Sequence, residues 1–237
     1  MKYSAMLVLL IVLLIDPFLS GAQTTSEQVA IYQNPIDFIK MNERYLIQNY
    51  HRYFVKIMDE VGALTIGIKE TKELKVGQVT FWGLKLWAKG DPDWSYQEKS
   101  ILINNLGDIL FEKDFRQIEP NMNLAECGVP NYQIENMEIM NIGNSELLKV
   151  EIHEYYEPCV GQPLVSTITW HLYSLENYQL IDTIEVFYKK KPYGEPAFIR
   201  QSDIMNRQNG ITVRTREMSG NKLINEFRKE YNLIPMK

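Results

Sequence analysis

Three segments in the second half of the chain alternate apolar and polar residues, and they constrain the fold more than any other feature of the sequence. They are residues 147–157 (LLKVEIHEYYE), 164–174 (LVSTITWHLYS) and 180–190 (LIDTIEVFYKK). Their β-branched and aromatic residues, spaced at a period of two, predict strands that are half-buried in a sheet. Because the connectors between them are short, we expect consecutive antiparallel pairing.

Weaker strand patterns surround these segments. Residues 64–68 and 78–88 each predict a strand, and residues 210–216 predict another near the C-terminus. Residues 100–112 (SILINNLGDILFE) predict two short strands joined by a turn around 105–108. The sheet is therefore expected to be mainly antiparallel.

Helices are predicted at both ends of this sheet. Asn34 and Pro35 are a typical cap and first residue of a helix, and apolar residues then recur at helical spacing from residue 36 to about 61. Aromatic side chains line its apolar face: Tyr45, Tyr50, Tyr53 and Phe54. A shorter helix is expected over residues 221–231. We therefore predict an α+β fold, a mainly antiparallel β-sheet covered by a long N-terminal helix, with a short C-terminal helix.

The first 22 residues have the pattern of a cleavable signal peptide. Lys2 precedes an apolar run over residues 7–15, and small residues occupy positions 20–22. The run is shorter than the roughly 20 residues that span a bilayer, and no later segment is long and apolar enough to do so. We expect residues 23–237 to form a single exported domain in the periplasm or outside the cell. The chain contains no Asn-x-Ser/Thr sequon, which favours a bacterial envelope.

Export makes the two cysteines candidates for a disulfide. Cys127 and Cys159 are the only cysteines of the chain, and each is flanked by glycine and proline. An even count in an oxidising compartment favours a bridge, which would stabilise the fold by roughly 3–4 kcal/mol. A pair of free thiols is the alternative. No Cys-x-x-Cys pair supports a redox activity.

The charge of the chain argues against one class of function. The formal net charge of −5 argues against a dedicated nucleic-acid binder. Residues 189–237 nevertheless hold 11 basic and 5 acidic side chains, beginning with three consecutive lysines. This basic end either docks against the acidic remainder of the chain or binds an anionic surface.

The best candidate for a catalytic or metal site comes from strand alternation. If residues 147–157 and 164–174 pair with position numbers summing to about 322, Glu151 lies opposite His171 and His153 lies diagonal to it. Glu185 could join them from the next strand. Two imidazoles among two carboxylates are typical of a divalent-metal or acid–base site. The alternative interpretation is the solvated polar face of a half-covered sheet, and a slip of one residue in the register would separate the group.

Tryptophans suggest a second kind of site. Trp82, Trp87 and Trp94 lie near the acidic turn at 90–93, and aromatic rings beside carboxylates are typical of sugar-binding surfaces. Trp82 and Trp87 differ in parity on one predicted strand, so they point to opposite faces and at least one belongs to the core.

The motifs of common enzymes are missing. The sequence contains no GxSxG, GxxxxGK[ST], GxGxxG or HExxH, and nothing in it calls for a cofactor. We therefore expect a non-catalytic binding or assembly module whose partner is a protein or polysaccharide of the envelope. A secreted hydrolase using Glu151, His153, His171 and Glu185 is the first alternative, and a carbohydrate-binding protein is the second.

Overall fold

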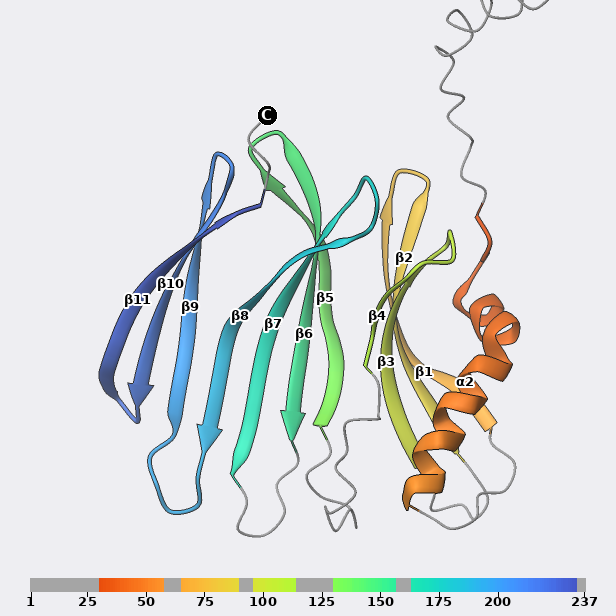
Figure 1. The fold of residues 1–237 in the computed structure, drawn as a ribbon, viewed down its shortest axis with the longest axis horizontal. Helices are drawn as coiled ribbons and strands as arrows, with labels where there is room; N and C mark the ends of the chain where they lie inside the picture. The colour runs from red at the N-terminus through yellow and green to blue at the C-terminus, as the bar shows by residue number, and fades with distance from the viewer. Residues whose placement is uncertain (1–29, 58–64, 90–95, 114–129, 157–162, 234–237) are drawn as a thin grey trace, which may run out of the picture.

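The computed structural model describes residues 30–57, 65–89, 96–113, 130–156 and 163–233. Within them lie one helix and eleven strands, labelled as in Figure 1. The elements are α2 (Pro35–Ile57), β1 (Thr65–Val76), β2 (Val79–Lys89), β3 (Tyr96–Asn104), β4 (Ile109–Glu112), β5 (Pro130–Ile142), β6 (Ser145–Tyr156), β7 (Leu164–Ser174), β8 (Leu180–Lys191), β9 (Phe198–Arg207), β10 (Gly210–Ser219) and β11 (Lys222–Asn232). The expected signal peptide, both cysteines and Trp94 lie outside the described residues.

The strands form two antiparallel sheets, and each follows the order of the sequence. The first sheet has four strands in the order β1-β2-β3-β4, and the second has seven in the order β11-β10-β9-β8-β7-β6-β5. The consecutive pairing expected for β6, β7 and β8 is confirmed. The two short strands predicted within residues 100–112 are the end of β3 and the whole of β4.

The predicted fold class is wrong. Apart from α2, the described elements are all strands, so the described part of the chain is nearly all-β rather than α+β. The start of the helix was predicted correctly, because the Asn34 side chain accepts hydrogen bonds from the backbone N–H groups of Ile36 and Asp37 at 2.9 and 3.1 Å. However, α2 lies on the outer side of the four-stranded sheet and does not cover the seven-stranded one (Figure 1).

The predicted C-terminal helix is also wrong, because residues 222–232 form the strand β11. Gly220 and Asn221 make a two-residue turn between β10 and β11, and Gly220 has a φ of 56°. That left-handed conformation favours glycine and matches the twist of a tight hairpin. The turn brings β11 back along β10 as the last strand of the sheet.

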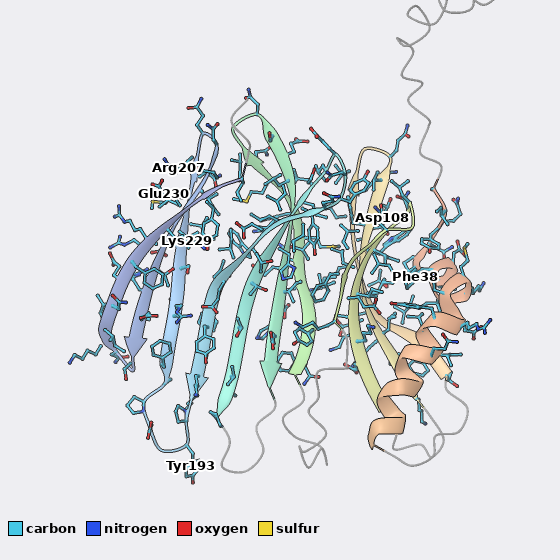
Figure 2. All side chains as sticks on the ribbon, viewed as in Figure 1. Phe38, Asp108, Tyr193, Arg207, Lys229 and Glu230 are labelled. Atoms are coloured by element: carbon cyan, nitrogen blue, oxygen red, sulfur yellow. The ribbon has the colours of Figure 1, made fainter. Side chains whose placement is uncertain are left out.

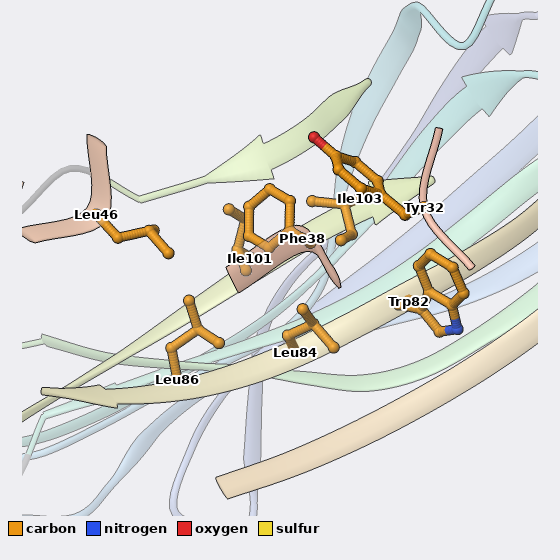
Figure 3. Packing of buried hydrophobic residues seen from close by; sticks show 8 residues of the cluster. All are labelled: Tyr32, Phe38, Leu46, Trp82, Leu84, Leu86, Ile101 and Ile103. Carbon is orange, nitrogen blue, oxygen red and sulfur yellow. The ribbon is translucent and has the colours of Figure 1, made fainter. Parts of the chain in front are cut away.

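Three hydrophobic clusters hold the layers together. The first joins Phe38 and Leu46 of α2 to Trp82, Leu84 and Ile101 on the facing side of the four-stranded sheet (Figure 3). The second lies between the two sheets and joins residues such as Phe81 and Leu102 to β5, β6 and β7. The helix therefore packs on the first sheet, and that sheet packs on the second.

The seven-stranded sheet is divided at the junction of β8 and β9. These strands pair only where Phe187–Lys190 of β8 meets Phe198–Gln201 of β9, and beyond this point they diverge (Figure 1). The third cluster joins residues on the two sides of the junction, among them Leu172 and Ile184 on one side and Ile211 and Val213 on the other. A short stretch of strand pairing and the packing of the third cluster therefore both join β9–β11 to the rest of the sheet.

Candidate functional site

The register of β6 and β7 separates the predicted cluster of histidines and carboxylates. Val150 lies opposite His171, and Glu151 lies opposite Trp170, so paired position numbers sum to one less than expected. Residues directly opposite each other share a face of the sheet, and neighbours along a strand alternate. Glu151 and His153 are therefore on one face, whereas His171 is on the other. The predicted pairing of Glu151 with His171 is wrong.

The cause of the slip is that both faces of this strand pair are covered. We expected one apolar and one polar face, but the second cluster packs on the face of Val150, and the third packs on the face of Leu147. Apolar residues are consequently required on both faces, and alternation alone does not fix the register. Trp170 consequently shares a face with Glu151 and His153, and His171 lies on the opposite face.

Glu151 belongs to a cross-strand network of structural contacts. Its carboxylate accepts a hydrogen bond from the indole Nε1 of Trp170 at 3.0 Å. The Nζ of Lys149 lies 3.9 Å from the centre of the same indole ring and forms an ion pair with Glu138. Each polar group thus has a partner within the sheet, as polar groups on a covered face require.

His153 lies on the same face but toward the edge strand β5. Its Nε2 is 2.8 Å from the hydroxyl of Ser166, and its Nδ1 is 3.4 Å from the carboxylate of Glu135. Both ring nitrogens are thus occupied by neighbouring side chains. These contacts fix the orientation of the ring.

His171 lies half-buried between the two sheets. Its ring packs edge-on against Phe111 of β4, with ring centres 5.5 Å apart, and its Nδ1 is 3.5 Å from the hydroxyl of Tyr173. Burial and, to a smaller extent, the nearby ammonium of Lys113 together lower the pKa of His171 to about 4. The ring is therefore neutral at pH 7.

Glu185 forms part of a separate ion-pair network at the junction of β8 and β9. Arg200 donates from Nη1 to Glu185 at 2.8 Å and from Nε to Glu217 at 3.0 Å. The hydrogen bond to Glu185 contributes most to raising the pKa of Arg200; burial opposes it, and the hydrogen bond to Glu217 adds a smaller increase. Glu185 is thus engaged in holding three strands together.

The four predicted site residues therefore do not converge on one point. In the described part of the chain, no three histidine, cysteine or acidic side chains are placed to hold a metal ion. Trp82 and Trp87 lie on opposite faces of β2, as their odd spacing along the strand predicted. Trp82 is 3% exposed in the first cluster and donates to Glu73, whereas Trp87 is half-buried over Gly67 of β1.

A feature that sequence reasoning missed is the outer edge of β11, the free side of the last strand. Within the described residues, β11 pairs with β10 and ends the sheet. All but one of its side chains are exposed, including three large apolar ones, Leu223 (53%), Ile224 (56%) and Phe227 (42%). Charged residues lie among them. Lys229 and Glu230 mark this strand at one side of the molecule (Figure 2).

Helical spacing concealed this strand. Leu223, Phe227 and Tyr231 are four residues apart, which is the pattern of an amphipathic helix. The signal that could have revealed it is the pair Gly220–Asn221, because Gly-Asn between two segments favours a two-residue hairpin.

The comparisons with known proteins give no family. Searches against protein-family models, curated proteins and solved structures found no match to this chain. In the residues described by the structure, no helix is both long enough and apolar enough to cross a membrane.

Proposed function

We propose that the chain is a non-catalytic binding or assembly module and that the outer edge of β11 is its binding site. The observation that carries this proposal is an exposed terminal strand of 11 residues that bears three exposed apolar side chains. Edge strands present unpaired N–H and C=O groups, which are a template for a strand from another chain. Adding such a strand is a common way for sheets to recognise extended partners.

The hydrolase alternative loses its support from geometry. Glu151, His153 and His171 are divided between two faces, and Glu185 is engaged by Arg200. A catalytic site needs its acidic and basic side chains within hydrogen-bond distance of the same bound substrate. The carbohydrate alternative is weakened because Trp82 belongs to the core.

We further propose that the module acts after export to the envelope. The support is the signal-peptide pattern of residues 1–22. The mass of the protein recovered from the envelope of its host should correspond to a chain that starts at residue 23 or within a few residues of it. A mature chain that retains Met1 would contradict export by this route.

The binding site can be tested by photo-cross-linking in the native host. A photoreactive amino acid at position 226 should form adducts with a partner chain, and the same probe at the exposed position Thr183 of β8 should not. The second change is Arg228→Pro, which removes one backbone N–H of the outer edge, compared with Arg228→Ala, which keeps it.

The adducts should disappear with the proline and persist with the alanine. Circular dichroism of both variants controls for folding. Adducts that survive Arg228→Pro in a folded protein would show that the backbone of β11 is not what the partner recognises.

A further inference from the structure

We propose that the partner of β11 is a second copy of this chain, paired antiparallel through β11, with Arg228 of each copy opposite a glutamate of the other. The inference rests on the proposed function, because it names the partner of the same edge. Two-fold dimers are the commonest oligomers, and an antiparallel strand pair has the two-fold symmetry that they require.

The backbone of β11 determines which residues can pair. The N–H of Leu233, which follows β11, donates to the carbonyl of Asn209, which precedes β10, at 3.1 Å. On the other side of β10, the N–H of Gly220 donates to the carbonyl of Ala197, which precedes β9, at 2.8 Å. In an antiparallel ladder, successive residues direct their backbone groups to alternate sides. With the observed register of β10 and β11, the groups that point to the outer edge belong to Glu226, Arg228, Glu230 and Asn232.

This alternation of backbone groups limits the registers in which two copies of β11 can pair about a two-fold axis. Edge residues must face edge residues, so the axis passes through one of residues 226 to 232. An axis at Glu226, Arg228 or Glu230 places that residue against itself, and an axis at Arg228 also sets Glu226 against Glu230. Like charges directly opposite each other destabilise a strand pair, which disfavours these three registers. An axis at Tyr231 or Asn232 leaves Arg228 with no described residue opposite it.

The remaining two registers both pair opposite charges. An axis at Phe227 places Arg228 opposite Glu226 of the second copy and stacks the two Phe227 rings. An axis at Lys229 places Arg228 opposite Glu230 and Phe227 opposite Tyr231, and it engages all four edge residues in about eight hydrogen bonds. The axial Lys229 side chains then face each other, although each Nζ lies 4.3 Å from its own Tyr231 ring.

The charges around Arg228 favour a carboxylate from outside the chain. Arg228 lies opposite Arg214 in the ladder, and Arg214 already binds Glu226 at 2.8 Å. Arg216, two residues further along β10, binds Asp203 of β9. Among the described residues, Arg228 forms no ion pair of its own. A glutamate of the second copy would therefore reach an arginine that has a like charge as its direct neighbour.

The apolar side chains of β11 support the same partner. Phe227 is exposed in the monomer, and both registers place an aromatic ring against it. Aromatic cross-strand pairs stabilise antiparallel strands. Charged residues on an edge strand can instead prevent association with another chain. The oligomeric state of the protein distinguishes this role from pairing with a second copy.

The test measures self-association of purified full-length protein by sedimentation velocity over a range of concentrations. The wild type should form a dimer. Arg228→Glu should weaken the dimer roughly tenfold or more, because both registers then place glutamate opposite glutamate twice. The matched control is Arg44→Glu, which makes the same change of charge at an exposed position of α2 and should leave the dimer intact.

Mixing single variants then identifies the register. Arg228→Glu mixed with Glu226→Arg restores two opposite-charge pairs if the axis is at Phe227, and Arg228→Glu mixed with Glu230→Arg restores them if the axis is at Lys229. Recovery of a mixed dimer in either experiment supports the proposal. Thermal melts of each variant control for folding, because Glu226 and Glu230 also form ion pairs within the chain.

Three results would overturn self-pairing: a wild type that is monomeric at every concentration, a dimer unaffected by Arg228→Glu, and a failure of both mixtures to recover. If adducts at position 226 in the host still depend on the backbone N–H of residue 228, the proposed function stands and its partner is a different chain. If those adducts are also missing, the proposed function fails with it.

Discussion

Acidification should destabilise this protein through one half-buried imidazole, that of His171. Its ring lies between the two sheets, against Phe111 and near the hydroxyl of Tyr173. Burial and the charge of Lys113 lower its pKa to about 4, whereas the pKa of an unfolded histidine is about 6.5. As the pH falls below 6.5, His171 becomes protonated in the unfolded chain but stays neutral in the folded chain, so the free energy of unfolding decreases.

The two pKa values determine the size of this effect. The difference in proton binding by His171 lowers the free energy of unfolding by about 2 kcal/mol between pH 7 and pH 5, and by about 3 kcal/mol by pH 4. Above pH 7 both states hold a neutral ring, and this contribution vanishes. Below pH 4 the folded protein is protonated as well, and the loss reaches its limit.

Urea denaturation at pH 7 and pH 5 measures the effect. His171→Gln should remove about 2 kcal/mol of the loss seen in the wild type, because glutamine does not titrate. His153→Gln is the matched control, since it removes an imidazole from the other face and should retain the loss. A His171→Gln variant that loses as much stability as the wild type would refute the argument that His171 is held neutral by burial.

Other substitutions test the packing. Phe38→Ala should lower the free energy of unfolding by about 3–5 kcal/mol, because the ring is fully buried between α2 and the first sheet; a cost near zero in urea denaturation would mean that α2 is not docked. Gly67→Ala should cost about 1–3 kcal/mol, because a Cβ there would lie 2.5 Å from the Trp87 ring; an unchanged melting temperature would contradict that contact. Non-reducing peptide mapping should link Cys127 to Cys159, and two free thiols would contradict the predicted disulfide.

The sequence predicted the local structure where one physical signal dominated. Period-two alternation identified β6, β7 and β8, and the cap at Asn34 located the start of α2. β11 was predicted as a helix because Leu223, Phe227 and Tyr231 have helical spacing, and an exposed edge strand has no buried face to impose alternation. β5 and β9 were missed because polar residues interrupt their alternation.

The candidate site failed for a different reason. Pairing Glu151 with His171 required the register to be correct to one residue, and a shift by one moves every side chain of a strand to the opposite face. That pairing also requires one solvated face, whereas clusters around Val150 and Leu147 cover both faces. Which faces are covered depends on the first sheet and on the path of β9–β11, and neither can be deduced from two strands alone.

The short pairing of β8 with β9 has a mechanical consequence. Only four residue pairs join these strands, whereas ten join β9 to β10. A force that pulls the C-terminus away from the body should therefore detach β9–β11 as one three-stranded unit before any hairpin within it opens. The detached unit would keep the hydrogen bonds between β9, β10 and β11. Its return to the rest of the sheet would depend on the contacts of Ile211 and Val213 with Leu172 and Ile184. A partner bound at β11 would thus pull directly on the weakest junction of the sheet.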